Sequence, residues 1–152
     1  MTRPPTVALL ALLAVAGSVA AGCGDDAREA VRSVTAEAGR ALDDLRAEAL
    51  AAQGAHVVIT YVRGADEAAK VVAAIQEKGG KAEAVGFDVA DMKASEDAMS
   101  DVAKRLGRLD ILVANAGGSM HMGALADADA EAIRATIDVN LTGTILSVKH
   151  AI

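Results

Sequence analysis

From residue 56 onward the sequence alternates between short β-branched runs and amphipathic helical runs, joined by brief connections. The pattern predicts strands over 56–61 and 81–88, a third strand that begins near 109, and helices over 66–78 and 95–106. Ser95 should cap the second helix, and Gly79 and Gly107 should end the two helices. Short connections between such elements require a parallel sheet, so the predicted fold class is α/β: a partial Rossmann-like, doubly wound parallel sheet with three clear strands.

The run 109–117 joins a buried strand to a tight loop, because Leu-Asp-Ile-Leu-Val-Ala breaks into Asn-Ala-Gly. Open α/β sheets bind ligands at the carboxyl ends of their strands. Asn115 is small enough to bond neighbouring backbone, and Gly117 lets the chain turn close to a ligand. If the loop requires a positive φ at Gly117, replacing it with Val should cost roughly 1 kcal/mol or more.

Four short motifs follow one another in a recognisable order: Phe87-Asp88-Val89, Gly107-Arg108-Leu109-Asp110, Ala114-Asn115-Ala116-Gly117, and Asp138-Val139-Asn140-Leu141-Thr142-Gly143. Together they resemble the short-chain dehydrogenase/reductase family, in particular its 3-oxoacyl-acyl-carrier-protein reductases, from residue 46 to 152. The family usually has Asn where this chain has Ala114. The resemblance implies a Rossmann-type NAD(P)-binding domain over 53–152. It also implies hydride transfer between a nicotinamide cofactor and a carbonyl or alcohol substrate.

The resemblance also assigns roles to individual residues. The implied cofactor-binding residues are Arg63, Asp88, Val89, Asn115, Ala116 and Gly117. Asp88 would accept a hydrogen bond from the adenine amino group while Val89 packs on the ring. Asn115 and Gly117 would border the adenosine ribose. Asn140 would support the catalytic proton relay, although a purely structural role for a buried Asn is equally open.

The end of the first clear strand bears on the choice of cofactor. An acidic residue there would bond the ribose of NAD, whereas a basic residue would pair with the 2′-phosphate of NADP. No acidic residue precedes Asp66 in this stretch, and Arg63 lies within it. NADP is therefore favoured, with a solvent-facing loop arginine as the alternative role for Arg63.

The family's general acid, a Tyr with a Lys four residues later, has no match in this sequence. The only tyrosine is Tyr61, with Ala65 four residues on, and Lys149 has Ile145 four residues before it. Ser147 lies on a helix rather than at a strand end. We therefore expect a truncated or fused reductase that is inactive as given, unless an oligomer or a partner chain completes the sheet.

The N-terminal third has a different character. Residues 6–24 carry no charge, follow Arg3, and end in small residues before Cys23. This layout predicts an apolar helix over 6–21 and a secretory signal, and it resembles a bacterial lipobox with Cys23 as the lipidation site. The competing interpretation is a phosphate-binding glycine loop at Gly17 and 22–27, whose spacing fits the family poorly.

An amphipathic helix should follow over 24–52, which divides the chain into 1–23, 24–52 and 53–152. Its predicted apolar face is Val31, Val34, Ala38, Leu42, Leu45 and Ala49, and its charged residues, Asp43 and Arg46 among them, should face solvent. The helix that starts at Asp129 should bury Ile133, Ile137, Leu141, Ile145, Val148 and Ile152, with a break near Asp138.

Composition narrows the function classes. A net charge of −6 and a pI of 5.0 argue against nucleic-acid binding. One cysteine excludes an internal disulfide, and the three histidines lack metal-binding spacing. Two interpretations remain: a cytoplasmic NADP-linked reductase acting on small molecules, and a membrane-anchored lipoprotein whose α/β domain serves structure or interaction.

Overall fold

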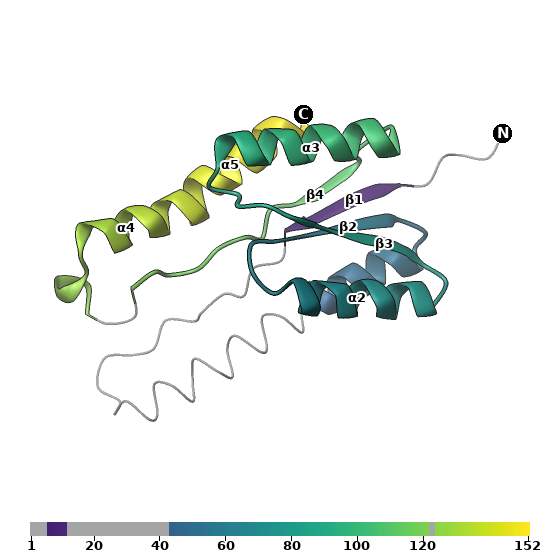
Figure 1. Ribbon diagram of the computed structural model, residues 1–152, viewed down its shortest axis with the longest axis horizontal. Coiled ribbons are helices and arrows are strands. Elements are labelled where there is room, and N and C mark those ends of the chain that lie inside the picture. Colours follow the sequence, from purple (N-terminus) through teal and green to yellow (C-terminus); the bar gives the residue numbers. More distant parts are fainter. Residues whose placement is uncertain (1–5, 12–42, 122–123) are drawn as a thin grey trace, which may run out of the picture.

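The computed structural model describes residues 6–11, 43–121 and 124–152, and Figure 1 shows their arrangement. Four parallel strands form one sheet in the order β3-β2-β1-β4. The strands are β1 Val7–Ala11, β2 His56–Tyr61, β3 Lys81–Gly86 and β4 Ile111–Val113. The predicted α/β class and the three predicted strands are confirmed, and the sheet gains a fourth strand from the N-terminal segment.

Strand β1 corrects the apolar helix expected over 6–21. It pairs with β2 from Val7 opposite His56 to Ala11 opposite Thr60, and with β4 from Ala8 opposite Ile111. An apolar run that is covered on both faces shows no alternation, so its period cannot distinguish a strand from a helix. Two parallel partners override the helical propensity of its alanines and leucines. The remainder of the expected helix lies outside the described residues, as do Gly17, Gly22 and Cys23 of the glycine-loop and lipobox interpretations.

Helices cover both faces of the sheet. A helix that includes residues 43–52 and α2, Ala65–Glu77, pack on one face, and α3, Met92–Leu106, packs on the other (Figure 1). Alternate residues of β2 separate the two cores: Val57 and Ile59 pack with the first pair of helices, whereas Val58 packs with α3. This alternation is the period of two that a strand covered on both sides must have.

The helix over 43–52 buries a different face from the one expected. Its buried residues are Asp43, Ala47 and Ala51, at steps of four, whereas Leu45 is 61% exposed. Small alanines let the helix lie close against the sheet. The prediction that Leu45 is buried and that Asp43 faces solvent is therefore wrong. Gly54 ends the helix as expected, with φ +87°.

Helix α3 begins earlier than predicted. The N-cap is Asp91, whose Oδ1 accepts hydrogen bonds from the backbone N–H groups of Lys93 and Ala94 at 2.9 and 3.0 Å. Ser95 lies inside the first turn and is fully buried, so the predicted Ser95 cap is wrong. An Asp at the N-cap satisfies two backbone donors that the helix leaves free, and this favours the earlier start. Gly107 caps the other end with φ +79°, as predicted.

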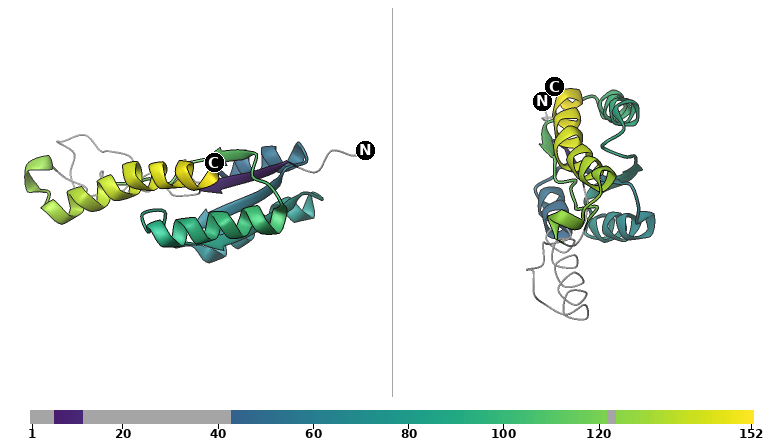
Figure 2. Two further views of the ribbon diagram at one scale, coloured as in Figure 1. Left: turned by 90° about the horizontal axis from the view of Figure 1, so that it is seen from above. Right: turned by 90° about the vertical axis from the view of Figure 1, so that its left-hand side faces the viewer.

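The chain after β4 forms a long helical rod. A 3-10 helix, Leu125–Asp127, precedes α4, Ala130–Ile137, a π-helical turn, Asp138–Thr142, and α5, Gly143–Ala151. Figure 2 shows α5 beside α3 and α4 extending past the sheet. The π-helical turn is the break expected near Asp138.

The predicted burial of the rod's apolar stripe is wrong. The stripe is exposed along its whole length, with Ile133 at 40%, Leu141 at 57% and Ile145 at 56%, because the rod buries a different face that includes Gly143, Leu146 and Ser147. Sequence periodicity identifies an apolar face without identifying what covers it. Among the helices of the described segments, none has the length and apolar composition to cross a membrane.

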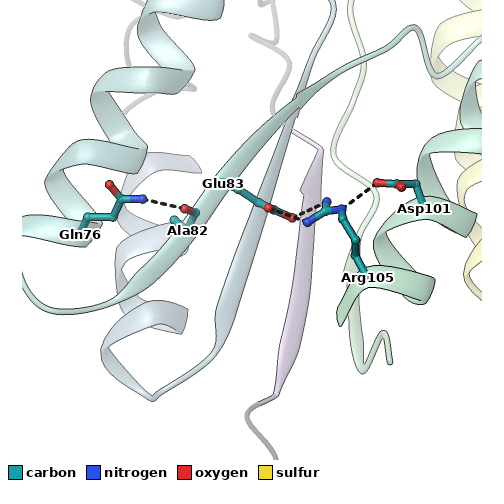
Figure 3. A network of polar contacts seen from close by, with 5 residues as sticks. All are labelled: Gln76, Ala82, Glu83, Asp101 and Arg105. Atoms are coloured by element: carbon teal, nitrogen blue, oxygen red, sulfur yellow. Dashed lines mark hydrogen bonds and ion pairs between the residues drawn. The ribbon is translucent and has the colours of Figure 1, made fainter. Parts of the chain in front are cut away.

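A polar network ties β3, the outer strand of the described sheet, to its neighbours (Figure 3). The Arg105 guanidinium donates to both oxygens of Glu83 at 2.8 and 2.9 Å and to Asp101 at 2.9 Å. These two carboxylates raise the pKa of Arg105. On the opposite side, Gln76 donates to the carbonyl of Ala82 at 3.0 Å. The ion-paired side chains of Glu83, Asp101 and Arg105 are partly to largely exposed, so these pairs contribute modestly to stability and support the sheet rather than a site.

Candidate functional site

The carboxyl edge of the sheet holds three of the predicted site residues. Arg63 follows β2, Asp88 follows β3 and Asn115 follows β4, and all four strands run in the same direction. Strands β2 and β3 are neighbours, about 4.8 Å apart, whereas β1 separates β2 from β4. The chain leaves β1 for β2 on one side while β4 lies on the other, and such a switch point is where open α/β sheets bind ligands.

Arg63 is exposed in the connection between β2 and α2. It makes no hydrogen bond or ion pair that involves the described residues. Gly64, at the N-cap of α2, adopts a left-handed conformation with φ +84° and provides no side-chain cap. The Arg63 guanidinium is therefore available to an anionic ligand, whereas the first turn of α2 carries the acidic side chains of Asp66 and Glu67.

Asp88 and Val89 make contacts within the chain. One Asp88 oxygen accepts the backbone N–H of Ala90 at 2.9 Å, which leaves its second oxygen as an acceptor. Val89 is 4% exposed, and its Cγ2 atom lies 2.8 Å from the position that a Cβ on Gly143 would occupy. Only glycine at 143 lets α5 approach this closely. The side chain of Val89 thus joins the β3 loop to α5.

Asn115 bonds a carboxylate that the sequence did not single out. Its Nδ2 donates to both oxygens of Asp43 at 2.9 Å, and Arg46 Nη1 donates to Asp43 Oδ1, also at 2.9 Å. Asp43 is only 3% exposed. Burial raises the pKa of its carboxyl, against the opposing effects of Arg46 and the Asn115 amide. The loop after β4 is therefore fastened to the helix that precedes β2.

Asn140 fastens the same loop to the helical rod. Its Oδ1 accepts the N–H of Gly118 at 3.1 Å, and its Nδ2 donates to the carbonyls of Gly118 and Thr136, each at 2.6 Å. Thr136 Oγ1 accepts the N–H of Met120 at 3.1 Å. The side chain of Asn140 thus bonds only backbone groups, at the π-helical turn.

Gly117 lies directly under Asn140. The condition of a positive φ at Gly117 is not met, because the positive-φ glycines of the described residues are Gly54, Gly64, Gly79 and Gly107. A Cβ at position 117 would instead lie 2.6 Å from Asn140 Oδ1. Close approach of a side chain, rather than backbone conformation, requires glycine here. Ala116, the remaining predicted cofactor contact, lies half-buried in the same loop.

The structure therefore gathers the predicted residues into two groups. Arg63 and Asp88 follow the neighbouring strands β2 and β3, whereas Asn115 and Gly117 lie in the loop after β4, where Gly117 contacts Asn140. Sequence reasoning missed Asp43, Thr136 and Gly143. The spacing of Asp43, Ala47 and Ala51 at four-residue steps is the one signal that could have identified Asp43 as part of a buried helix face.

The residues considered for acid-base chemistry are not gathered in one place. The ring of Tyr61, at the end of β2, covers Gly86 on β3, with ring atoms 3.1 Å from a built Cβ. Ser147 is 2% exposed within α5. Lys149 is exposed near the end of α5, two turns beyond Asn140. These positions do not bring a tyrosine and a lysine together.

Comparison with known proteins identifies the family. The family model described as short chain dehydrogenase matches residues 34–152. Cis-4-hydroxycyclohexanecarboxylate dehydrogenase of Sinomonas cyclohexanicum is 40% identical over 107 residues, which are 70% of this chain and 42% of that protein. The 3-oxoacyl-[acyl-carrier-protein] reductase of Synechocystis sp. is 37% identical over 112 residues, which are 74% of this chain and 45% of that protein.

Solved structures agree with this result. A short chain dehydrogenase from Burkholderia cenocepacia J2315, in complex with NADP, superposes with a TM-score of 0.65 and 43% identity. The match covers 69% of this chain and 42% of that one. The chain thus spans less than half the length of the relatives it matches. On these matches and on the parallel sheet with its motifs, the chain belongs to the short-chain dehydrogenase/reductase family of NAD(P)-dependent oxidoreductases.

Proposed function

We propose that this chain supplies the adenosine-binding part of an NADP-linked short-chain oxidoreductase. The observation that carries the proposal is that Arg63 is exposed just beyond β2 and makes no ion pair within the described part of the chain, while Asp88 follows the neighbouring strand β3. A guanidinium at this edge pairs with a 2′-phosphate, and no carboxylate between β2 and α2 repels it. The relative from Burkholderia cenocepacia was solved in complex with NADP, which supports the same cofactor.

The residues present fit the adenosine end of the cofactor. The free oxygen of Asp88 accepts from an adenine amino group, and the loop 115–117, held by Asn140, borders the ribose. When bound, NADPH supplies the hydride for a carbonyl. In our proposal the chain's own residues bind and orient the nucleotide, and Val89, packed on Gly143, holds the loop after β3 against α5.

We further propose that the polypeptide of 152 residues binds nucleotide without turnover. Tyr61 is its only tyrosine; it lies at the carboxyl end of β2 with its ring over Gly86, whereas Lys149 lies on α5. A positioned general acid contributes about 10²–10⁴ in rate, and Tyr61 lacks the lysine that would tune it. The proposed substrate class, taken from the family, is a small-molecule carbonyl or alcohol.

Strand β1 favours the reductase over the lipoprotein interpretation. Processing at Cys23 would remove residues 1–22, and with them the strand that lies between β2 and β4. A sheet that lost β1 would expose Val58 and Leu112, which pack around Val7. Lipidation of Cys23 itself stays a prediction outside the described residues.

Calorimetric titration with NADP⁺ and NAD⁺ tests the proposal, with the Arg63→Ala variant beside the native chain. Loss of a charge-assisted phosphate contact should weaken NADP⁺ binding about tenfold and leave NAD⁺ within about twofold. Lys70→Ala, which removes one exposed positive charge from α2, is the matched control. Equal losses for both cofactors, or for both variants, would contradict the proposed role of Arg63.

A further inference from the structure

Asp43 lies at the carboxyl edge of the sheet although it belongs to a helix that covers one face. The helix over 43–52 leads into the amino end of β2, so Asp43 lies about 13 Å from that end, towards the opposite edge. Its contact with Asn115, just beyond β4, fixes this position independently. The carboxylate therefore lies next to the switch point between β1 and β4.

The negative charge of Asp43 is weakly screened, because its carboxylate is buried. With 3% of the residue exposed, little water screens the carboxylate. Arg46 Nη1 pairs with Asp43 Oδ1 at 2.9 Å, and the Arg46 side chain is 52% exposed. Solvent therefore screens the charge of Arg46 more than that of the buried carboxylate, both oxygens of which are held by Asn115 at the edge.

A dinucleotide requires the opposite charge here. In sheets of this kind the pyrophosphate sits at the switch point, where backbone N–H groups and a helix start favour an anion. A buried carboxylate within hydrogen-bond distance of the loop after β4 opposes that anion. Among residues 6–11, 43–121 and 124–152, those at this end of the edge therefore fit a pyrophosphate poorly, in contrast to Arg63.

We propose that Asp43 is a selectivity residue of the cofactor site, whose carboxylate, held on Asn115 beside β1 and β4, disfavours the pyrophosphate of a dinucleotide. This proposal rests on the proposed function, because the pyrophosphate lies beside Asp43 only if the nucleotide binds along the carboxyl edge of the sheet. A whole dinucleotide makes more contacts than its adenosine end alone and would ordinarily bind more tightly. If Asp43 has this role, the dinucleotide gains less affinity over the adenosine end than its added contacts would provide.

The experiment compares Asp43→Asn with the native chain in titrations with NADP⁺, adenosine 2′-monophosphate and inorganic pyrophosphate. The amide keeps an acceptor for Asn115 and removes the charge. We expect NADP⁺ and pyrophosphate to bind about tenfold more tightly to the variant, with adenosine 2′-monophosphate unchanged within about twofold. Glu48→Gln is the control, because it removes the same charge about 7.5 Å further along the same helix, where Glu48 pairs with Lys78.

The outcomes separate this proposal from the proposed function. If the native chain does not bind adenosine 2′-monophosphate, but Asp43→Asn gains pyrophosphate binding that Glu48→Gln lacks, the proposed function fails and the role of Asp43 stands. If adenosine 2′-monophosphate binds through Arg63 while the native chain and both variants bind NADP⁺ and pyrophosphate equally, the role of Asp43 is wrong. Asp43→Ser replaces Asp43→Asn if thermal melting shows that the amide variant does not fold.

Discussion

Asn140 Oδ1 occupies the space that a side chain at Gly117 would need, since a Cβ built there lies 2.6 Å from that oxygen. The same oxygen accepts the N–H of Gly118, so it cannot move away without breaking that bond. The loop after β4 and the π-helical turn are thereby fixed against each other. This contact joins the two halves of the motif pair Ala-Asn-Ala-Gly and Asp-Val-Asn-Leu-Thr-Gly.

Gly117→Ala should therefore destabilise the fold by about 1–3 kcal/mol, because the Asn140 side chain must shift or lose its bonds. Gly118→Ala is the matched control, since the nearest atom to its built Cβ is the flexible Met120 Cε at 3.9 Å. Urea unfolding followed by circular dichroism measures both. Equal stability of the two variants would show that the loop adapts to a side chain at 117.

The helical rod offers a second matched pair. Leu146 is 5% exposed and Ile145 is 56% exposed, although both lie on α5. Leu146→Ala should lower the free energy of unfolding by about 2–5 kcal/mol, because it leaves a cavity beneath the helix. Ile145→Ala should change it by about 1 kcal/mol or less. A larger loss for Ile145→Ala would mean that its side chain is covered in solution.

The pH dependence of stability should report on Asp43. Burial raises the pKa of its carboxyl above the ordinary 3.8, so the folded chain holds this proton more tightly than the unfolded chain. The resulting stabilisation is present below pH 3.8 and is lost as pH rises through the higher pKa of the folded state. The stability of Asp43→Asn relative to the native chain should therefore increase as pH rises through that window. A constant difference from acid to neutral pH would contradict the raised pKa.

Substitutions at and just before the N-cap of α3 should have smaller effects on the free energy of unfolding. Asp91→Ala removes the acceptor for two backbone N–H groups and should cost about 1 kcal/mol. Asp88→Ala removes a single bond to the Ala90 N–H and should cost less. Chemical denaturation of the two variants checks the order, and a larger loss for Asp88 would place the helix start elsewhere.

The sequence predicted β2, β3, β4 and the helices between them, because the strands are short β-branched or apolar runs, the helices have an apolar stripe, and Gly79 and Gly107 follow the helix ends. It failed at β1, where Val7 and Ala8 are buried in a run with no polar residue to mark its period. It failed again on which helix face is covered: Leu45 and Ile145 are apolar yet exposed. Covered faces depend on tertiary packing, which no single helix encodes.

In the candidate site, too, some residues could be predicted from the sequence and others could not. Arg63, Asp88 and Asn115 were predictable because strand ends can be located in the sequence, and parallel strands bring those ends to one edge. The partners that hold them were not. The bond between Asp43 and Asn115 joins residues 72 positions apart, and that between Asn140 and Gly118 crosses 22. Such contacts require the assembled sheet.

An amide-resolved NMR titration with adenosine 2′-monophosphate tests whether adenosine binds at the carboxyl ends of β2 and β3. We expect saturable shifts that are largest at Arg63, Gly64, Asp88 and Val89, and the loss of these shifts in Arg63→Ala. Shifts that do not saturate, or that are largest at the amino edge around His56 and Lys81, would contradict binding at the carboxyl ends.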